Sequence, residues 1–147
     1  MKLCDSFRVA GHGVRTVLRE ERNFRIHLCI SCYVLFFAWF AEVLDKLPIL
    51  LLCIGLVLSM ELANSAIESL ADALRPEFDP KIGAAKDIAA GAVLFAAIFT
   101  ALVGLWIFCA PNILSLVWEK LIAMPWILAV ILLPLLPMYI FCKAPRG

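Results

Sequence analysis

The sequence predicts an all-α membrane protein, with an N-terminal amphipathic surface helix, three core transmembrane helices and an extra apolar helix at the C-terminus. Hydrophobic residues make up 64% of the 147-residue chain, whereas soluble domains contain about 45–50%. These residues are gathered into almost uncharged stretches, several of which reach the ~20 residues that a helix needs to cross a bilayer. The net charge is only +1, and we expect no nucleic-acid partner.

Residues 5–22 have the pattern of a helix that lies in the membrane interface. At about 100° per residue, one face of such a helix is apolar and another is basic. The apolar face contains Phe7, Ala10, Val14, Val17 and Leu18, and the basic face contains Arg8, His12, Arg15, Arg19 and Arg22. Glu21 is an exception, because its position falls on the apolar face, where a side chain points towards the protein or the bilayer rather than water.

Four transmembrane spans are expected, at residues 28–44, 47–71, 88–109 and 121–142. The charged segment 72–87 and the short link 110–120 would then be loops. In an alternative arrangement, the prolines in and near the last stretch break it into a re-entrant or interfacial piece. These prolines are Pro125, Pro134 and Pro137.

The distribution of charge orients the chain in the membrane. The first 25 residues hold six basic residues and three acidic ones, so the positive-inside rule places the N-terminus in the cytoplasm. Segment 72–87 is then cytoplasmic as well, and Lys143 and Arg146 return to the cytoplasm after the fourth span.

Polar residues interrupt the cytoplasmic end of the second span. They are Glu61, Asn64, Ser65, Glu68 and Asp72, and their spacing puts them on one stripe of a helix. A carboxylate in hydrocarbon costs at least ~2.5 kcal/mol, whereas polar contacts between membrane helices average only ~0.6 kcal/mol. The stripe therefore indicates a functional site, although Asp72 by itself could be a solvated helix end. Glu61 and Glu68 are ~10 Å apart along the helix axis, so one can serve a lipid headgroup and the other a metal.

The start of the third span combines small residues with a Lys–Asp pair. The small residues are Ala84, Ala85, Ala89, Ala90, Gly91 and Ala92; they allow close helix packing and also leave room for a ligand. Lys86 and Asp87 follow the segment that carries Glu77 and Asp79, so they face the same compartment as Glu68. Basic and acidic groups at that level suit a metal–nucleotide complex. Neither a P-loop nor a Rossmann fingerprint is present.

Three segments resemble the bacterial membrane diacylglycerol kinase/undecaprenol kinase family. They are Glu61–Glu68 (ELANSAIE) with Asp72 after it, Ala85–Val93 (AKDIAAGAV), and Glu21–His27 (ERNFRIH) at the entry to the first span. The resemblance covers about residues 5–109. We therefore expect residues 1–109 to form a lipid kinase core and residues 110–147 to add an apolar extension with a further transmembrane helix.

The resemblance implies a homotrimer in the bacterial plasma (inner) membrane, with active sites shared between subunits at the cytoplasmic interface. Glu61 would be the base that takes the proton from the lipid hydroxyl, supported by Asn64. Glu68 and Glu21 would hold the Mg²⁺ that comes with ATP. The implied nucleotide contacts are Glu68, Glu77, Phe78, Asp79, Lys86 and Asp87, with Asp79 standing where the family has His. The implied lipid contacts are Glu61, Arg25 and Ala90, and the supporting residues are Asp72 and Ser65.

The leading functional expectation is an ATP- and Mg²⁺-dependent kinase that converts diacylglycerol to phosphatidic acid. The alternative is an undecaprenol kinase, whose branch the segments Asn23–His27 and Ala89–Val93 resemble slightly more. A small transporter or proton-relay protein is a more distant alternative, because acids inside a membrane also mark ion paths. The cytoplasmic placement of nearly all the polar groups counts against a path through the membrane.

Overall fold

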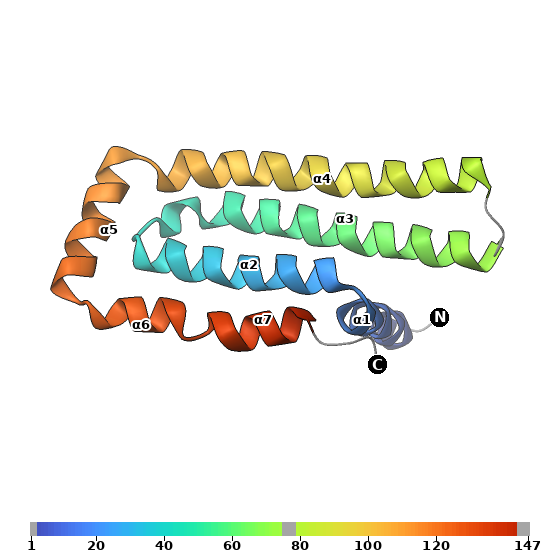
Figure 1. The fold of residues 1–147 in the computed structure, drawn as a ribbon, viewed down its shortest axis with the longest axis horizontal. Helices are drawn as coiled ribbons and strands as arrows, with labels where there is room; N and C mark the ends of the chain where they lie inside the picture. Colours follow the sequence, from blue (N-terminus) through green and yellow to red (C-terminus); the bar gives the residue numbers. More distant parts are fainter. Residues whose placement is uncertain (1–2, 75–78, 144–147) are drawn as a thin grey trace.

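The computed structural model describes residues 3–74 and 79–143, and every regular element in them is helical. In chain order the elements are α1 (Leu3–Glu20), α2 (Arg22–Phe40), the 3₁₀ turn η1 (Leu44–Lys46), α3 (Leu47–Leu74), α4 (Pro80–Phe108), α5 (Pro111–Ala123), α6 (Trp126–Leu132) and α7 (Leu135–Lys143). Helices α2, α3 and α4 lie side by side along the long axis (Figure 1). Helix α1 crosses one end of this bundle and α5 crosses the other.

Within the described residues, four helical stretches are long and apolar enough to cross a membrane, which confirms the predicted fold class. They are Arg22–Phe40, Leu44–Leu74, Pro80–Phe108 and Trp126–Lys143. The fourth stretch consists of α6 and α7, which lie end to end beside α2 (Figure 1). The break falls at Pro134, because proline has no N–H to donate and its ring clashes with the preceding turn.

The two predicted loops are largely helical, so these loop predictions were wrong. Helix α3 continues to Leu74 and α4 begins at Pro80, which places Asp72 and Lys86 on helices. The α4 start has local causes: the Asp79 side chain accepts a hydrogen bond from the Lys81 N–H at 2.9 Å, and proline is favoured at the first helical position. The link 110–120 likewise forms most of α5, which also begins with a proline.

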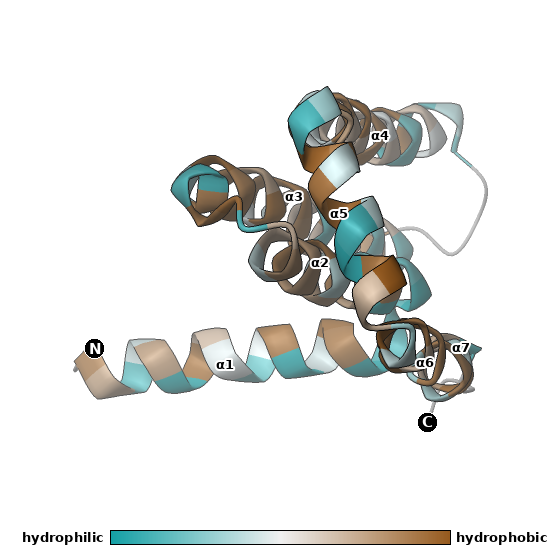
Figure 2. Ribbon diagram, turned by 90° about the vertical axis from the view of Figure 1, so that its left-hand side faces the viewer, coloured by the Kyte–Doolittle hydropathy of each residue, from teal (hydrophilic) through white to brown (hydrophobic). Residues whose placement is uncertain are grey.

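Helix α1 has the exposure expected of an interfacial helix. None of its residues is buried, and large apolar side chains such as Phe7 are open, at 71% exposure. Polar and apolar residues both occur along its whole length (Figure 2). Burial of the apolar side in lipid would satisfy these side chains.

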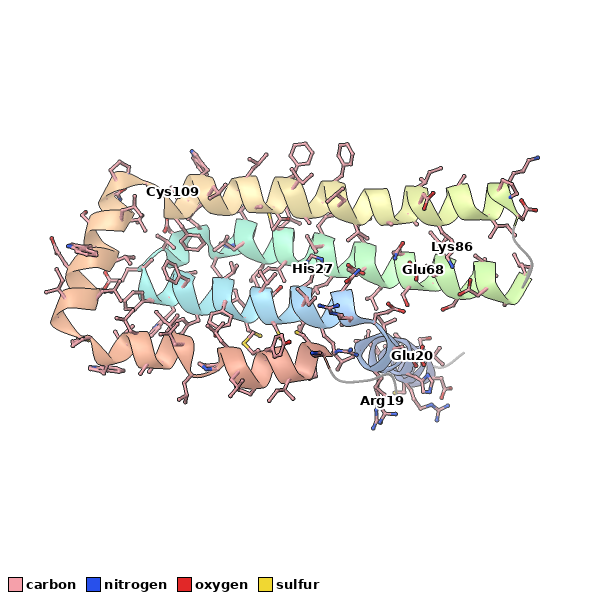
Figure 3. The ribbon with its side chains drawn as sticks, viewed as in Figure 1. Arg19, Glu20, His27, Glu68, Lys86 and Cys109 are labelled. Carbon is pink, nitrogen blue, oxygen red and sulfur yellow. The ribbon has the colours of Figure 1, made fainter. Side chains whose placement is uncertain are left out.

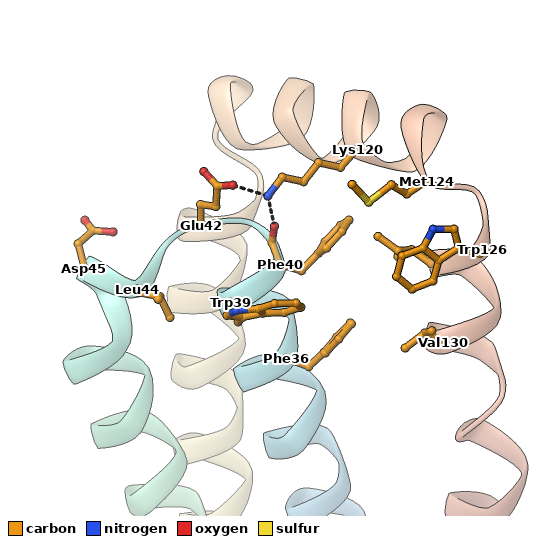
Figure 4. A pocket seen from close by; sticks show the side chains of 11 residues that line it. Phe36, Trp39, Phe40, Glu42, Leu44, Asp45, Lys120, Met124, Trp126 and Val130 are labelled. Carbon is orange, nitrogen blue, oxygen red and sulfur yellow. Dashed lines mark hydrogen bonds and ion pairs between the residues drawn. The ribbon is translucent and has the colours of Figure 1, made fainter.

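The C-terminal extension is fixed to α2 by hydrogen bonds at helix ends. The Lys120 ammonium donates to the Phe40 carbonyl at 2.9 Å and contacts the Glu42 carboxylate at 2.6 Å (Figure 4). The Tyr33 hydroxyl donates to the Ile131 carbonyl at 2.9 Å. Because the last carbonyls of a helix have no partner within it, these two donors cap α2 and α6.

The end of α2 adopts a Schellman motif with glutamate in the position that usually holds glycine. The Glu42 N–H bonds the Trp39 carbonyl at 3.2 Å, and the Val43 N–H bonds the Ala38 carbonyl at 3.0 Å. Glu42 accordingly has a φ of 59°. A cavity of about 700 Å³ lies beside this turn, between α2 and the extension, and Trp39 and Trp126 are among its lining residues (Figure 4).

Candidate functional site

The polar stripe of α3 becomes more exposed towards the end of the helix. Glu61 is 4% exposed and Ser65 is 7% exposed, Asn64 and Glu68 are half-buried, and Asp72 is exposed. The 28 residues of α3 span about 42 Å, which exceeds the ~30 Å hydrocarbon core. The polar end of α3 can therefore extend beyond the hydrocarbon core.

Glu61 is buried against α2. Its Oε1 lies 3.3 Å from Nε2 of His27, and the side chains are 5% and 24% exposed. Figure 3 shows His27 near the middle of the long axis of the bundle, with Glu68 and Lys86 further to the right along α3 and α4. The contact joins the carboxylate of one helix to the only described imidazole on the neighbouring helix α2.

Three carboxylates converge at this point. Glu21 and Glu68 both lie within electrostatic range of Glu61. Glu21 sits at the break between α1 and α2, where it is half-buried and its side chain does not cap α2. Like charges that are brought together in a poorly solvated place repel one another, so this arrangement favours a bound cation.

Asn64 forms a hydrogen bond with another residue of the stripe. Its side-chain amide donates to Glu68 Oε1 at 2.8 Å, and its own Oδ1 is buried without a hydrogen-bond partner among the described residues. Oxygen atoms of carboxylates and amides are the ligands that Mg²⁺ prefers, and an unpaired buried oxygen is costly. The donor chemistry therefore fits Mg²⁺. Within residues 3–74 and 79–143, however, no group of three or more His, Cys, Asp or Glu side chains is arranged as a complete metal site.

Lys86 joins α4 to the end of the stripe. Its ammonium lies 2.8 Å from Asp72 Oδ1, and it is also within electrostatic range of Glu68. Asp87 and Ala90 lie on the same helix and are exposed. Asp79 serves as the N-cap of α4, while the predicted nucleotide contacts Glu77 and Phe78 lie outside the described residues.

Arg25, which we predicted to contact the lipid, is 4% exposed and is bound to the surface helix. Its Nη1 donates to the carbonyls of Arg19 at 2.6 Å and Leu18 at 3.3 Å. Its guanidinium also lies 6.0 Å from the Phe141 ring, within the range of a cation–π contact. Arg25 thus holds the end of α1, and with it the adjacent Glu21, against α2 and α7.

An apolar groove runs along the bundle from the polar site. Its volume is about 470 Å³, and it lies between α2, α3 and α4. Nearer the site it is lined by His27, Val57 and Ala97, and at the far end by Leu50 and Cys109. The distance from Ala97 to Cys109 along α4 corresponds to about 18 Å. This groove can hold one extended hydrocarbon chain, with a polar end at His27.

His27 is a site residue that the sequence analysis did not single out, although it belongs to the quoted segment Glu21–His27. An ionisable side chain inside a membrane span is by itself a sign of function. The predicted first span begins at residue 28 and so leaves His27 outside it, whereas α2 begins at Arg22.

Together the fold and the site define a multi-pass membrane protein with an acidic site that favours a cation and an apolar groove that leads to it. The family model for prokaryotic diacylglycerol kinase matches residues 8–108, and the chain belongs to this family. It is therefore a kinase that phosphorylates a lipid alcohol, and not the small transporter or proton-relay protein considered as an alternative.

The chain is similar to two named kinases. The chain is 40% identical to an undecaprenol kinase of Bacillus subtilis (strain 168) over 104 residues, which are 70% of this chain and 85% of that protein. It is 38% identical to a diacylglycerol kinase of Synechocystis sp. over 114 residues, which are 76% of this chain and 64% of that protein. No solved structure matches the chain. The family match ends at residue 108, so α5, α6 and α7 lie outside it.

Proposed function

We propose that this kinase transfers the γ-phosphate of ATP to undecaprenol in a Mg²⁺-dependent reaction at the cytoplasmic face of a bacterial plasma membrane. Diacylglycerol is the second candidate acceptor. The single observation that carries the choice is the groove of about 470 Å³, which can hold one chain. The part of a polyprenol chain next to its hydroxyl could lie there with the rest of the chain in the bilayer, whereas diacylglycerol carries two chains next to its hydroxyl and only one of them could enter. The match covers 85% of the undecaprenol kinase relative against 64% of the diacylglycerol kinase relative, which supports the same choice.

Glu61 is the proposed acceptor of the proton from the lipid hydroxyl. Its burial supports this role, because a carboxylate that is 4% exposed is kept apart from bulk water. As the lipid oxygen loses its proton, it attacks the γ-phosphorus, and the bond to the β-phosphate oxygen breaks to release ADP. General-base assistance of this kind typically contributes 10²–10⁴-fold to the rate, so on the order of that factor depends on Glu61.

Glu21 and Glu68 are the proposed ligands of Mg²⁺, and Asn64 orients Glu68. When bound, Mg²⁺ would neutralise negative charge on the phosphates of ATP. Two carboxylates suffice, since Mg²⁺ usually keeps several waters and phosphate oxygens among its ligands. Lys86 and Asp87 are proposed to contact the nucleotide, with Asp72 and Ser65 supporting the site.

Ala90 is proposed to leave room for the lipid, and Arg25 to serve lipid binding by fixing the end of α1. The proposed assembly is a homotrimer whose subunits share active sites. The exposure of Asp87 and Ala90 supports this assembly, because a neighbouring subunit could then reach the same nucleotide.

A side-by-side assay tests the acceptor. The purified full-length chain in nanodiscs is given ATP labelled at the γ-phosphate, Mg²⁺, and either undecaprenol or diacylglycerol at matched mole fractions. Label is expected in undecaprenyl phosphate, with kcat/KM at least about tenfold higher, a 1.4 kcal/mol difference. Faster labelling of phosphatidic acid would show that diacylglycerol is the preferred acceptor. No labelling of either lipid would refute the proposal.

A further inference from the structure

His27 occupies the position between the lipid groove and the buried carboxylate. The described residues that line the groove include His27 but not Glu61. The imidazole is also the more open of the two side chains, at 24% against 5% exposure. A lipid hydroxyl that reaches the polar end of the groove therefore meets His27 before it meets Glu61.

The contact with Glu61 fixes which nitrogen carries the proton. A carboxylate oxygen 3.3 Å from Nε2 favours the tautomer with the proton on Nε2, because an N–H can donate to it whereas a lone pair would be repelled. Nδ1 then carries the lone pair and is the basic atom. The distance is slightly longer than a hydrogen bond of 2.7–3.2 Å, and such contacts often tighten when substrate binds.

We propose that His27 relays the proton from the lipid hydroxyl to Glu61. The lipid O–H bond breaks as an Nδ1–H bond forms, while the Nε2–H bond breaks as an O–H bond forms on Glu61. The lipid oxygen uses the electron pair that it gains to bond the γ-phosphorus. This inference rests on the proposed function, in which Glu61 is the final acceptor of that proton.

The burial of Glu61 favours transfer in this direction. Its side chain is 5% exposed, and a proton on the carboxylate removes a charge from this poorly solvated place. His27 remains neutral before and after the transfer, since it gains a proton at Nδ1 and loses one at Nε2. The relay therefore moves a proton inward without placing an isolated charge in the membrane, which would be costly.

Substitution of His27 separates the relay from a packing role. His27→Gln keeps a polar side chain of similar length but cannot pass a proton through a ring, and His27→Ala opens space for added imidazole. We expect kcat to fall by about 100-fold or more in both variants, with KM for undecaprenol changed much less. Added imidazole should raise the turnover of His27→Ala but not that of His27→Gln. The matched control is His12→Gln, which changes the exposed histidine on α1 and should leave kcat unchanged.

The outcomes distinguish this inference from the proposed function. The relay is refuted if His27→Gln turns over at the wild-type rate while Glu61→Gln does not. The relay is also refuted if added imidazole does not raise the turnover of His27→Ala although this variant still binds Mg-ATP. Its loss of activity would then come from lost packing rather than from the lost proton transfer. If Glu61→Gln retains full turnover, the proposed role of Glu61 fails, and the relay, which ends on Glu61, fails with it.

Discussion

Replacing Asn64 with alanine should weaken Mg²⁺-dependent turnover without unfolding the protein. The Asn64 amide donates to Glu68 Oε1 at 2.8 Å, and hydrogen bonds to charged groups contribute about 1.5–3 kcal/mol. At ~1.4 kcal/mol per factor of ten, losing the orientation of Glu68 corresponds to about 10- to 150-fold. The same substitution removes the buried, unpaired Oδ1, which returns about 1–3 kcal/mol. The lost hydrogen bond and the removed unpaired oxygen therefore nearly cancel in the free energy of unfolding. The affinity for Mg²⁺ has no such compensation.

The assay for Asn64→Ala is a titration of lipid-dependent ATP consumption with Mg²⁺ at saturating ATP and lipid. The Mg²⁺ concentration at half-maximal rate should rise by about 10- to 150-fold, because a group that orients a metal ligand is lost, with little change in Tm. Asn112→Ala, on the exposed surface of α5, is the matched control. An unchanged Mg²⁺ dependence would refute the role of Asn64 and would count against Glu68 as a metal ligand.

Three further predictions concern the rest of the molecule. Lys86→Met should raise the ATP concentration for half-maximal turnover by about tenfold. An unchanged ATP concentration would show that Lys86 does not contact the nucleotide and that its role is the 2.8 Å contact with Asp72. A chain that ends at Ala110 should keep lipid-dependent turnover but unfold at a lower Tm, since the Phe40 carbonyl at the end of α2 loses the hydrogen bond from Lys120, worth ~1 kcal/mol; loss of all turnover would make the extension part of the enzyme core. The Cys29 and Cys142 thiols lie 3.8 Å apart, so mild oxidation should link α2 to α7, and mass spectrometry that finds no such link would contradict the packing of α7.

The parts of the site that lie on one helix could be predicted from the sequence, because a helical period fixes which residues share a face. This is why Asn64 and Glu68 were placed together and are in contact. The inward direction of Glu21 was foreseen in the same way, although the residue lies at the break before α2 rather than in the surface helix.

Contacts that depend on the angle between helices could not be predicted in this way. Arg25 binds carbonyls at the end of α1, and that geometry depends on the sharp turn between α1 and α2. The pairing of His27 with Glu61 depends on the register of α2 against α3. The error at residues 72–87 has a local cause: Asp79-Pro80 was interpreted as part of a loop, whereas an N-cap aspartate followed by proline is also the signal for the start of a helix.

The most direct test of the proposed chemistry is the transfer of labelled γ-phosphate from ATP to lipid by Glu61→Gln, measured beside the wild-type chain. Glutamine fills the same space but cannot accept the proton, so lipid labelling should fall by about 10²-fold or more, while binding of Mg-ATP stays near the wild-type level. Labelling at the wild-type rate would contradict the assignment of Glu61 as the acceptor of the lipid proton.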